Sequence, residues 1–147
     1  MSQTYSFKDV SANIAGPTGS ADLGYGAAVS DEGITIAMRG DKETMDIGAD
    51  GTPMHSLHAD KSATVIIHLL KTSPVNALLM AMYDSQQISS TLWGQNIIVI
   101  RENESGDITT CASCGFKKAP DIKYAKEGGM VDWEFNAGTK DTVLGIY

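Results

Sequence analysis

The sequence predicts one mainly β domain of 147 residues, a β-sandwich or barrel with one packed α-helix and one long loop. Three observations lead to this fold class. Short segments of alternating polar and apolar residues recur along the chain, which is typical of half-buried strands. Glycine is abundant, with 15 residues, and aromatic residues make up only 7% of the chain, so turns outnumber helix-forming segments. A single segment has the apolar spacing of a helix.

The first half of the chain predicts short strands separated by turns. We expect these strands over residues 5–12, 34–39, 44–48 and 63–70. Residues 16–20 read Gly-Pro-Thr-Gly-Ser, a turn sequence, and Asp50-Gly51 is a second strong turn signal. Residues 63–70 are the clearest core strand because Val65, Ile67 and Leu69 share one face.

Residues 73–84 predict the helix. Ser73 is a favourable N-cap, and Pro74 suits the first helical position. The apolar side chains form a stripe at i, i+3, i+4 and i+7, with a second patch beside it. The stripe consists of Val75, Leu78, Leu79 and Met82, and the patch of Met80 and Tyr83. A helix with apolar residues on two sides is either deeply packed in the core or wedged at a boundary between subunits, and both readings stay open.

The second half predicts further strands, which bring the total to eight or nine. They cover residues 97–101, 107–112, 121–125, 131–136 and 142–146. Residues 103–106 are the turn of a hairpin between the first two of these strands. In the segment from residue 131, Val131, Trp133 and Phe135 point inward and Asp132 and Glu134 point outward.

Composition excludes several classes of function. The net charge is −7, from 18 acidic and 11 basic residues, which disfavours nucleic-acid binding because phosphate contacts need lysine and arginine. The longest apolar run, residues 77–82, is far shorter than the ~20 residues of a membrane span. The N-terminus lacks the pattern of a secretion signal, so we expect synthesis and residence in a cytoplasm.

One pair of motifs suggests metal or redox chemistry. Cys111 and Cys114 form C-x-x-C, and His55 and His58 form H-x-x-H, which together could supply four zinc ligands. No helix start follows the cysteines, so a pair of small reduced strand residues is the simpler interpretation. No nucleophile stands in a recognisable setting beside the histidines, and we therefore expect no enzyme activity and no cofactor.

Several blocks of sequence, in order, resemble a known family. The segments DKETMDIGADGTPMHSLHADKSA, LLKTSPVNALL, WGQNIIVI and WEFNAGTKDTVLGIY are similar to the tail tube proteins of long contractile-tailed bacteriophages. The resemblance runs from Phe7 to the C-terminus. It implies a structural protein that assembles into hexameric rings, which stack into a hollow tube for phage DNA. If about four strands per protomer line the channel, about 24 strands at ~4.8 Å spacing enclose a circle about 37 Å wide, enough for a DNA duplex.

The resemblance also implies roles for particular residues. Residues 41–60 would be a loop that reaches the neighbouring ring, and the predicted helix would lie at a subunit boundary. The docking residues of the inter-ring loop would be Asp41, Met45, Asp50, Met54, His55, Leu57 and His58. Asp46, Asp132 and Glu134 are candidates for an acidic channel lining that DNA passes without specific binding.

The implied partners are those of a virion tail. They are further copies of the chain, a tail sheath protein, baseplate proteins and a tail terminator, assembled in the host cytoplasm with no membrane contact. Two alternatives remain. One is the tube of a related contractile injection or secretion system, and the other is a small Cys/His metal-binding domain.

Overall fold

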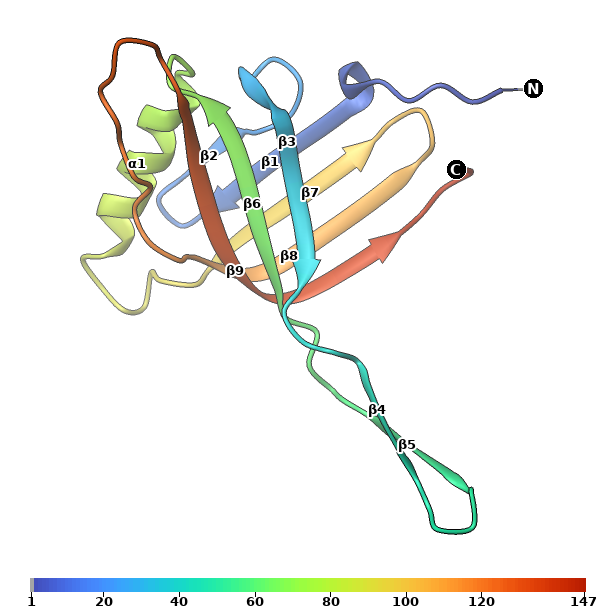
Figure 1. Cartoon of the computed structure of the whole chain (residues 1–147). Coiled ribbons are helices and arrows are strands. Elements are labelled where there is room, and N and C mark those ends of the chain that lie inside the picture. Colours follow the sequence, from blue (N-terminus) through green and yellow to red (C-terminus); the bar gives the residue numbers. More distant parts are fainter. Residues whose placement is uncertain (1) are drawn as a thin grey trace.

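The computed structural model describes residues 2–147, and these form a mainly β fold with one α-helix, as predicted (Figure 1). A short 3-10 helix, Phe7–Asp9, precedes the first strand. The strands are β1 (Val10–Gly16), β2 (Gly19–Asp22), β3 (Val29–Met38), β4 (Glu43–Ile47), β5 (Pro53–Leu57), β6 (Ala63–Leu70), β7 (Asn96–Glu102), β8 (Asp107–Phe116) and β9 (Met130–Val143), and helix α1 spans Val75–Gln86. Nine strands within the described residues agree with the expected eight or nine.

Seven of the strands form one continuous antiparallel sheet. Their order is β2-β1-β7-β8-β9-β6-β3, and the sheet curls into a half-barrel that helix α1 closes on one side (Figure 1). Strands β4 and β5 form a separate two-stranded hairpin that extends away from this body. Strands β2 and β3 are therefore the two edges of the sheet, and each has one side without a strand partner in the protomer.

The curl depends on strand β9, which changes partner along its length. Residues 130–137 pair with β6, and residues from Phe135 to Val143 pair with β8, so residues 135–137 have a strand on both sides. Gly138 lies directly after the last pair with β6, where an added Cβ would be 3.0 Å from Cβ of Ser113. A side chain at residue 138 would press against β8, so glycine permits the bend there.

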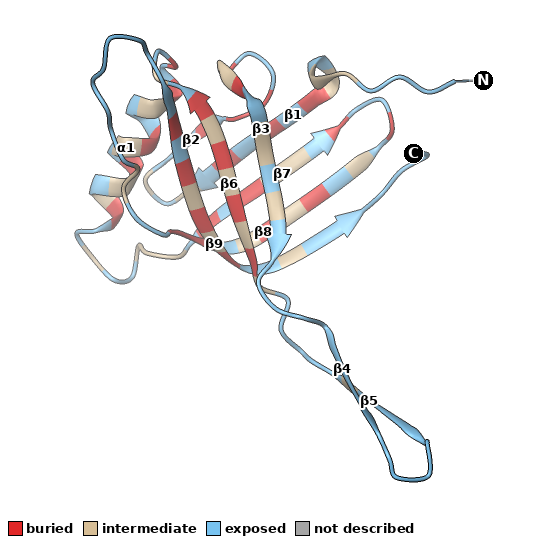
Figure 2. Ribbon diagram, viewed as in Figure 1, coloured by how far each residue is buried: buried red, intermediate tan, exposed pale blue. Residues whose placement is uncertain are grey.

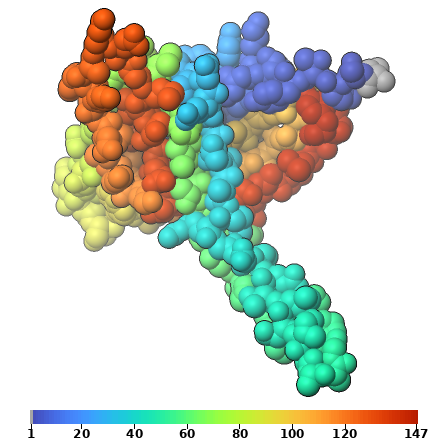
Figure 3. Space-filling view, in the orientation of Figure 1, coloured from blue at the N-terminus to red at the C-terminus, as the bar shows by residue number. Residues whose placement is uncertain are grey.

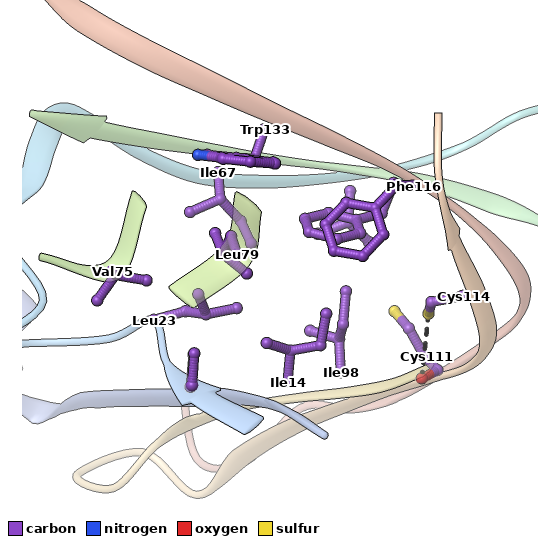
Figure 4. Packing of buried hydrophobic residues seen from close by; sticks show 14 of the residues in the cluster. Ile14, Leu23, Ile67, Val75, Leu79, Ile98, Cys111, Cys114, Phe116 and Trp133 are labelled. Atoms are coloured by element: carbon purple, nitrogen blue, oxygen red, sulfur yellow. Dashed lines mark hydrogen bonds between the residues drawn. The ribbon is translucent and has the colours of Figure 1, made fainter. Parts of the chain in front are cut away.

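The core fills the concave side of the half-barrel, between the sheet and helix α1. Burial alternates along β6 and along residues 130–137 of β9, with every second residue buried, as expected for strands with one face on the core (Figure 2). Phe116 lies at the centre, in edge-on or tilted contact with Trp133, Phe135 and Tyr83. Leu79 from the helix and Ile14 and Ile98 from β1 and β7 complete this packing (Figure 4).

A buried polar pair joins the end of helix α1 to the start of β7. The side chains of Gln86 and Asn96 are fully buried and exchange two hydrogen bonds, at 2.8 and 2.9 Å. The Gln86 amide also donates to Oγ1 of Thr18, at 3.2 Å. Gly16 lies against the pair, since a Cβ there would be 1.9 Å from Oδ1 of Asn96. Each amide nitrogen and oxygen atom of the pair thus has at least one hydrogen-bond partner within the protein.

The structure corrects several predicted boundaries. The strand expected over residues 5–12 begins only at Val10, because Ser6 accepts a hydrogen bond from the Lys8 amide and holds the preceding residues in a 3-10 turn. The segment 121–125 is not a strand; its residues are exposed and pair with no neighbour. The two strands expected over 131–136 and 142–146 are parts of β9, which ends at Val143.

The helix is confirmed, with a shift in its limits. It runs from Val75 to Gln86, two residues later at each end than the predicted 73–84. Pro74 is the N-cap residue rather than the first helical residue, and Ser73 still contributes, since its Oγ accepts from the Val75 amide at 3.2 Å. The Ser73 hydroxyl also donates to the Ala27 carbonyl, which ties the helix start to the sheet edge.

Candidate functional site

The segment predicted as a long loop is a β-hairpin. Strands β4 and β5 pair in register through five residues, from Glu43↔Leu57 to Ile47↔Pro53. The turn is closed by hydrogen bonds from the Gly48 amide to the Thr52 carbonyl, at 2.8 Å, and from the Thr52 amide to Oδ1 of Asp50, at 3.0 Å. The hydrogen bonds that Thr52 donates to the Asp50 carboxylate lower the pKa of Asp50. Residues 41–60 therefore form an ordered arm (Figure 3).

The arm has apolar side chains that the described residues, 2–147, leave largely exposed. Met45, Ile47, Met54 and Leu57 are all more than half exposed, and Leu57 reaches 81%. Single exposed apolar residues are common on protein surfaces, but the strand register places Met45, Ile47 and Leu57 together on one face of the hairpin, with Met54 on the opposite face. Ile47 is absent from the predicted docking residues, although its alternation with Met45 along β4 could have identified it.

The polar residues predicted for docking mostly stabilise the arm itself. His55 contacts the carboxylate of Glu43 across the two strands, and His58 hydrogen-bonds Oγ1 of Thr44 at 2.7 Å. Asp50 forms the turn, as described above. Asp41 is exposed at the base of the arm. The apolar residues are thus free to contact a partner, whereas the histidines are already engaged within the hairpin.

Helix α1 has one buried face, which differs from the predicted stripe. Val75, Leu79 and Met82 are buried, but Leu78 is half exposed, beside a shallow hollow that β1 and β2 also line. Met80 and Tyr83 are partly buried and pack against the core cluster, so the second apolar patch is an internal contact. Most of the apolar surface of the helix is therefore covered by its own protomer, and Leu78 is the exception. A role at a subunit boundary stays a prediction.

The residues predicted to line a channel do not form one cluster in the protomer. Asp132 and Glu134 lie on the outward face of β9, whereas Asp46 lies in the hairpin. Nδ1 of His68 is 2.7 Å from Asp132 and 3.2 Å from Glu32, and Nζ of Lys117 is 2.9 Å from Glu134. This face therefore mixes acidic and basic groups. Glu32, His68 and Lys117 were missed by sequence reasoning because strand pairing brings them beside β9.

The possible zinc ligands lie in separate parts of the fold. Cys111 and Cys114 are free thiols buried in the core, where the Cys114 thiol hydrogen-bonds the Cys111 carbonyl (Figure 4). His55 and His58 belong to the hairpin, so the structure does not bring the four residues together. Burial raises the pKa of Cys114 to about 12, which leaves a protonated, unreactive thiol.

A cavity of about 570 Å³ opens between strand β3 and the segments near both termini. In Figure 3 it is the hollow beside the β3 segment, with β7 and β8 behind it.

No helix among residues 2–147 has the length and apolar character needed to span a membrane.

Solved structures of contractile injection systems share this fold. The sheath/tube terminator of an extracellular contractile injection system, PVC, aligns with a TM-score of 0.64 at 9% identity, over 97% of this chain and 98% of that chain. A chain from the anti-feeding prophage baseplate aligns with a TM-score of 0.57 at 10% identity, over 97% of both chains. A chain from the cap of the same prophage aligns with a TM-score of 0.56, at 10% identity and over 99% and 95% of the two chains.

The family assignment comes from sequence. A search of curated protein sequences found no match. The profile of the bacteriophage PhiTE tail tube protein family, in contrast, matches residues 1–145, nearly the whole chain. With the shared fold of the tube-associated structures, this match places the chain in a class of structural proteins. The chain belongs to the bacteriophage PhiTE tail tube protein family.

Proposed function

We propose that this protein forms hexameric rings that stack head to tail into the tail tube of a contractile-tailed phage, and that phage DNA passes through the tube during ejection. The role is structural and requires no catalysis. It places the protein in the virion tail, after assembly in the host cytoplasm, with sheath, baseplate and terminator proteins as its partners.

The observation that carries the assembly proposal is the β4–β5 hairpin. It projects from the body as an ordered arm, and its apolar side chains are exposed in the isolated protomer. A contact from this arm to a different surface of another copy is heterologous, and repetition of such a contact builds an open filament. The free edges of β2 and β3 support the same proposal, since ring closure would cover edges that otherwise invite uncontrolled pairing.

Charge supports a channel that DNA passes without adhering. Each protomer carries −7, so six copies carry −42 per ring. Duplex DNA carries about one negative charge per ~1.7 Å of its axis, and a basic lining would bind it and retard its movement. Asp46, Asp132 and Glu134 remain our candidates for the lining, with Asp132 in contact with the His68 ring and the charge of Glu134 partly balanced by Lys117.

Electron microscopy of the concentrated purified protein tests this function. We expect six-fold rings or tubes from the native chain. A variant with residues 41–60 replaced by a Gly-Ser linker should keep the fold of the body and form single rings at most. Monomers at high concentration for both proteins would contradict the proposal.

A tube of a contractile injection system is the second candidate, favoured by the shared fold over nearly the full chain length. Purification of phage particles or injection particles from the source cells would distinguish the two. The chain should be present in tails attached to DNA-filled capsids under the first proposal, and in particles without capsids under the second.

A further inference from the structure

The cavity between β3 and the terminal segments has an apolar floor that the protomer leaves open. Its floor is formed by Val10, Val29, Ile34, Ile36 and Ile100. The cavity is also lined by Ser30, whose buried hydroxyl has no hydrogen-bond partner among residues 2–147. Its volume of about 570 Å³ lies in the range of sites that hold a ligand or several side chains.

The lining of the cavity is acidic. It includes four carboxylates against one basic group, Arg101: Asp31 and Glu32 are exposed at its rim, Asp107 is half-buried and Glu102 is buried. The neighbouring Tyr147 supports a negative potential at this end of the molecule. Its pKa is raised to about 12 by loss of hydration, by its hydrogen bond to Glu102, and by the charges of Glu102, Glu104 and Asp9. An occupant of the cavity therefore has to be basic at its edges and apolar at its centre.

One segment of the same chain has this composition. Residues 117–127, which we call the lysine loop, hold four of the 11 basic residues and two acidic ones, so the rest of the chain carries −9. Lys117 pairs with Glu134, but Lys118, Lys123 and Lys126 form no ion pair within the described residues. Among them stands Tyr124, which is 86% exposed, with the Lys71 ammonium 5.6 Å from its ring centre.

The lysine loop and the cavity belong to different sides of the protomer. The loop runs from the end of β8 to the start of β9, past helix α1 (Figure 1), and its Lys118 and Lys123 border the outward face of β6 and β9. The cavity lies on the other side of edge strand β3, against β7, β8 and the terminal segments. A contact between these two surfaces is heterologous and can close a ring when repeated. A fully exposed tyrosine flanked by lysines is typical of an interface anchor, because it buries a large area and keeps a polar tip.

We propose that the lysine loop of one protomer docks over the acidic cavity of a second copy, with Tyr124 inserted toward the apolar floor. This contact rests on the proposed function, and it assigns the surface by which neighbours within a ring recognise each other. The lysines provide orientation and encounter rate, while the tyrosine provides the buried area.

Charge neutralisation tests the electrostatic part. We expect Lys123→Gln with Lys126→Gln to raise the protein concentration needed for ring formation at least tenfold at low salt, and the difference should shrink at 0.5 M salt as screening increases. The matched control, Lys61→Gln with Lys140→Gln, removes the same charge from the other end of β9 and should change this concentration less than threefold. Equal effects of the two variants would overturn the proposal.

Cross-linking tests the geometry. Ala125→Cys and Asp31→Cys in one chain place exposed thiols beside Tyr124 and at the cavity rim, and native Cys111 and Cys114 are buried and should not react. A short bis-maleimide should give a ladder of covalent oligomers up to the hexamer. The control, Leu57→Cys with Asp31→Cys, should give no covalent oligomers. If the control cross-links and the Ala125→Cys with Asp31→Cys protein does not, the hairpin rather than the lysine loop occupies the cavity, and the proposal is wrong. If electron microscopy shows rings but the Ala125→Cys and Asp31→Cys protein gives no covalent oligomers, this contact is wrong and the tube function still stands. If no rings form, both the contact and the tube function are wrong.

Discussion

The hairpin residue Leu57 offers the sharpest test of the arm as a connector between copies. Leu57 is 81% exposed in the protomer, so its side chain gains burial only on assembly. Leu57→Ala removes three carbon atoms, and at about 0.8 kcal/mol for each the loss is about 2 kcal/mol per contact if the site is fully buried. That free energy corresponds to about a 30-fold rise in the protein concentration at which tubes form.

The assay compares assembly with folding for the same variant. Sedimentation over a range of concentrations gives the threshold for tube formation, and denaturant unfolding gives the stability of the protomer. The stability should change by less than about 0.5 kcal/mol, since the side chain contacts little in the protomer. Ile88→Ala, at a position 83% exposed beyond the end of helix α1, is the matched control and should leave the threshold unchanged. An unchanged threshold for Leu57→Ala would refute the role of the arm.

Three further predictions follow from contacts within the protomer. Gln86→Leu leaves the buried Asn96 amide unpaired and should cost about 2–4 kcal/mol of unfolding free energy, measured with denaturant, while adding Asn96→Leu should recover part of the loss. The thiol of Cys114, with its pKa raised from 9.0 to about 12, keeps its proton in the folded state after the unfolded chain has lost it, so stability should fall as pH rises from 9 toward 12. Cys114→Ala should flatten this slope in thermal melts. Asp132→Lys with Glu134→Lys should permit tube formation but slow DNA delivery in an ejection assay.

Each of these has an outcome that would contradict it. A Gln86→Leu protein as stable as the native chain would mean that water replaces the lost partner. If Cys114→Ala leaves the fall in stability between pH 9 and 12 unchanged, other groups cause that fall. Tyr147 is the first candidate, because its pKa is also raised to about 12. Normal DNA delivery by the Asp132 and Glu134 variant would remove both residues from the channel lining.

The elements that the sequence predicted well are those in which local pattern and tertiary burial agree. Strand β6 matches residue for residue, because Val65, Ile67 and Leu69 alternate with less buried residues. Helix α1 was found from its cap and apolar spacing. Strand β5 was missed because Pro-Met-His-Ser-Leu carries no β-branched residue, and only its pairing with β4 makes it a strand.

The parts of the candidate site that could not be predicted depend on contacts between distant segments. The cavity combines residues near both termini with β3 and the β7–β8 hairpin, and no local pattern marks such a convergence. The contact of His68 with Glu32 and Asp132 likewise follows from the order β3-β6-β9. Leu78 belongs to the predicted apolar stripe but is half exposed, because helical spacing alone does not fix how much of such a stripe the protomer covers.

The replacement of an expected loop by a hairpin has an energetic consequence for assembly. A flexible loop of this length would lose conformational freedom on docking, at a cost of about 1–2 kcal/mol for each residue fixed. A two-stranded hairpin is marginal alone, but this one is held at its base, where the Arg39 and His58 amides donate to the Ser62 and Lys42 carbonyls. The hydrogen bond from Thr52 to Asp50 fixes the turn at its tip, and the cross-strand contact of His55 with Glu43 joins the two strands nearer the base.

An arm that is ordered before it meets its partner converts more of its apolar burial into affinity. This argument separates two kinds of change in the hairpin. Thr52→Gly leaves every exposed apolar side chain in place but loosens the turn, so it should slow docking and raise the assembly threshold without removing any contact. Amide hydrogen exchange in the protomer should show faster exchange across β4 and β5 for this variant. If amide exchange becomes faster but the concentration needed for assembly does not rise, the pre-ordering of the arm does not matter for assembly. Only its apolar side chains would then matter.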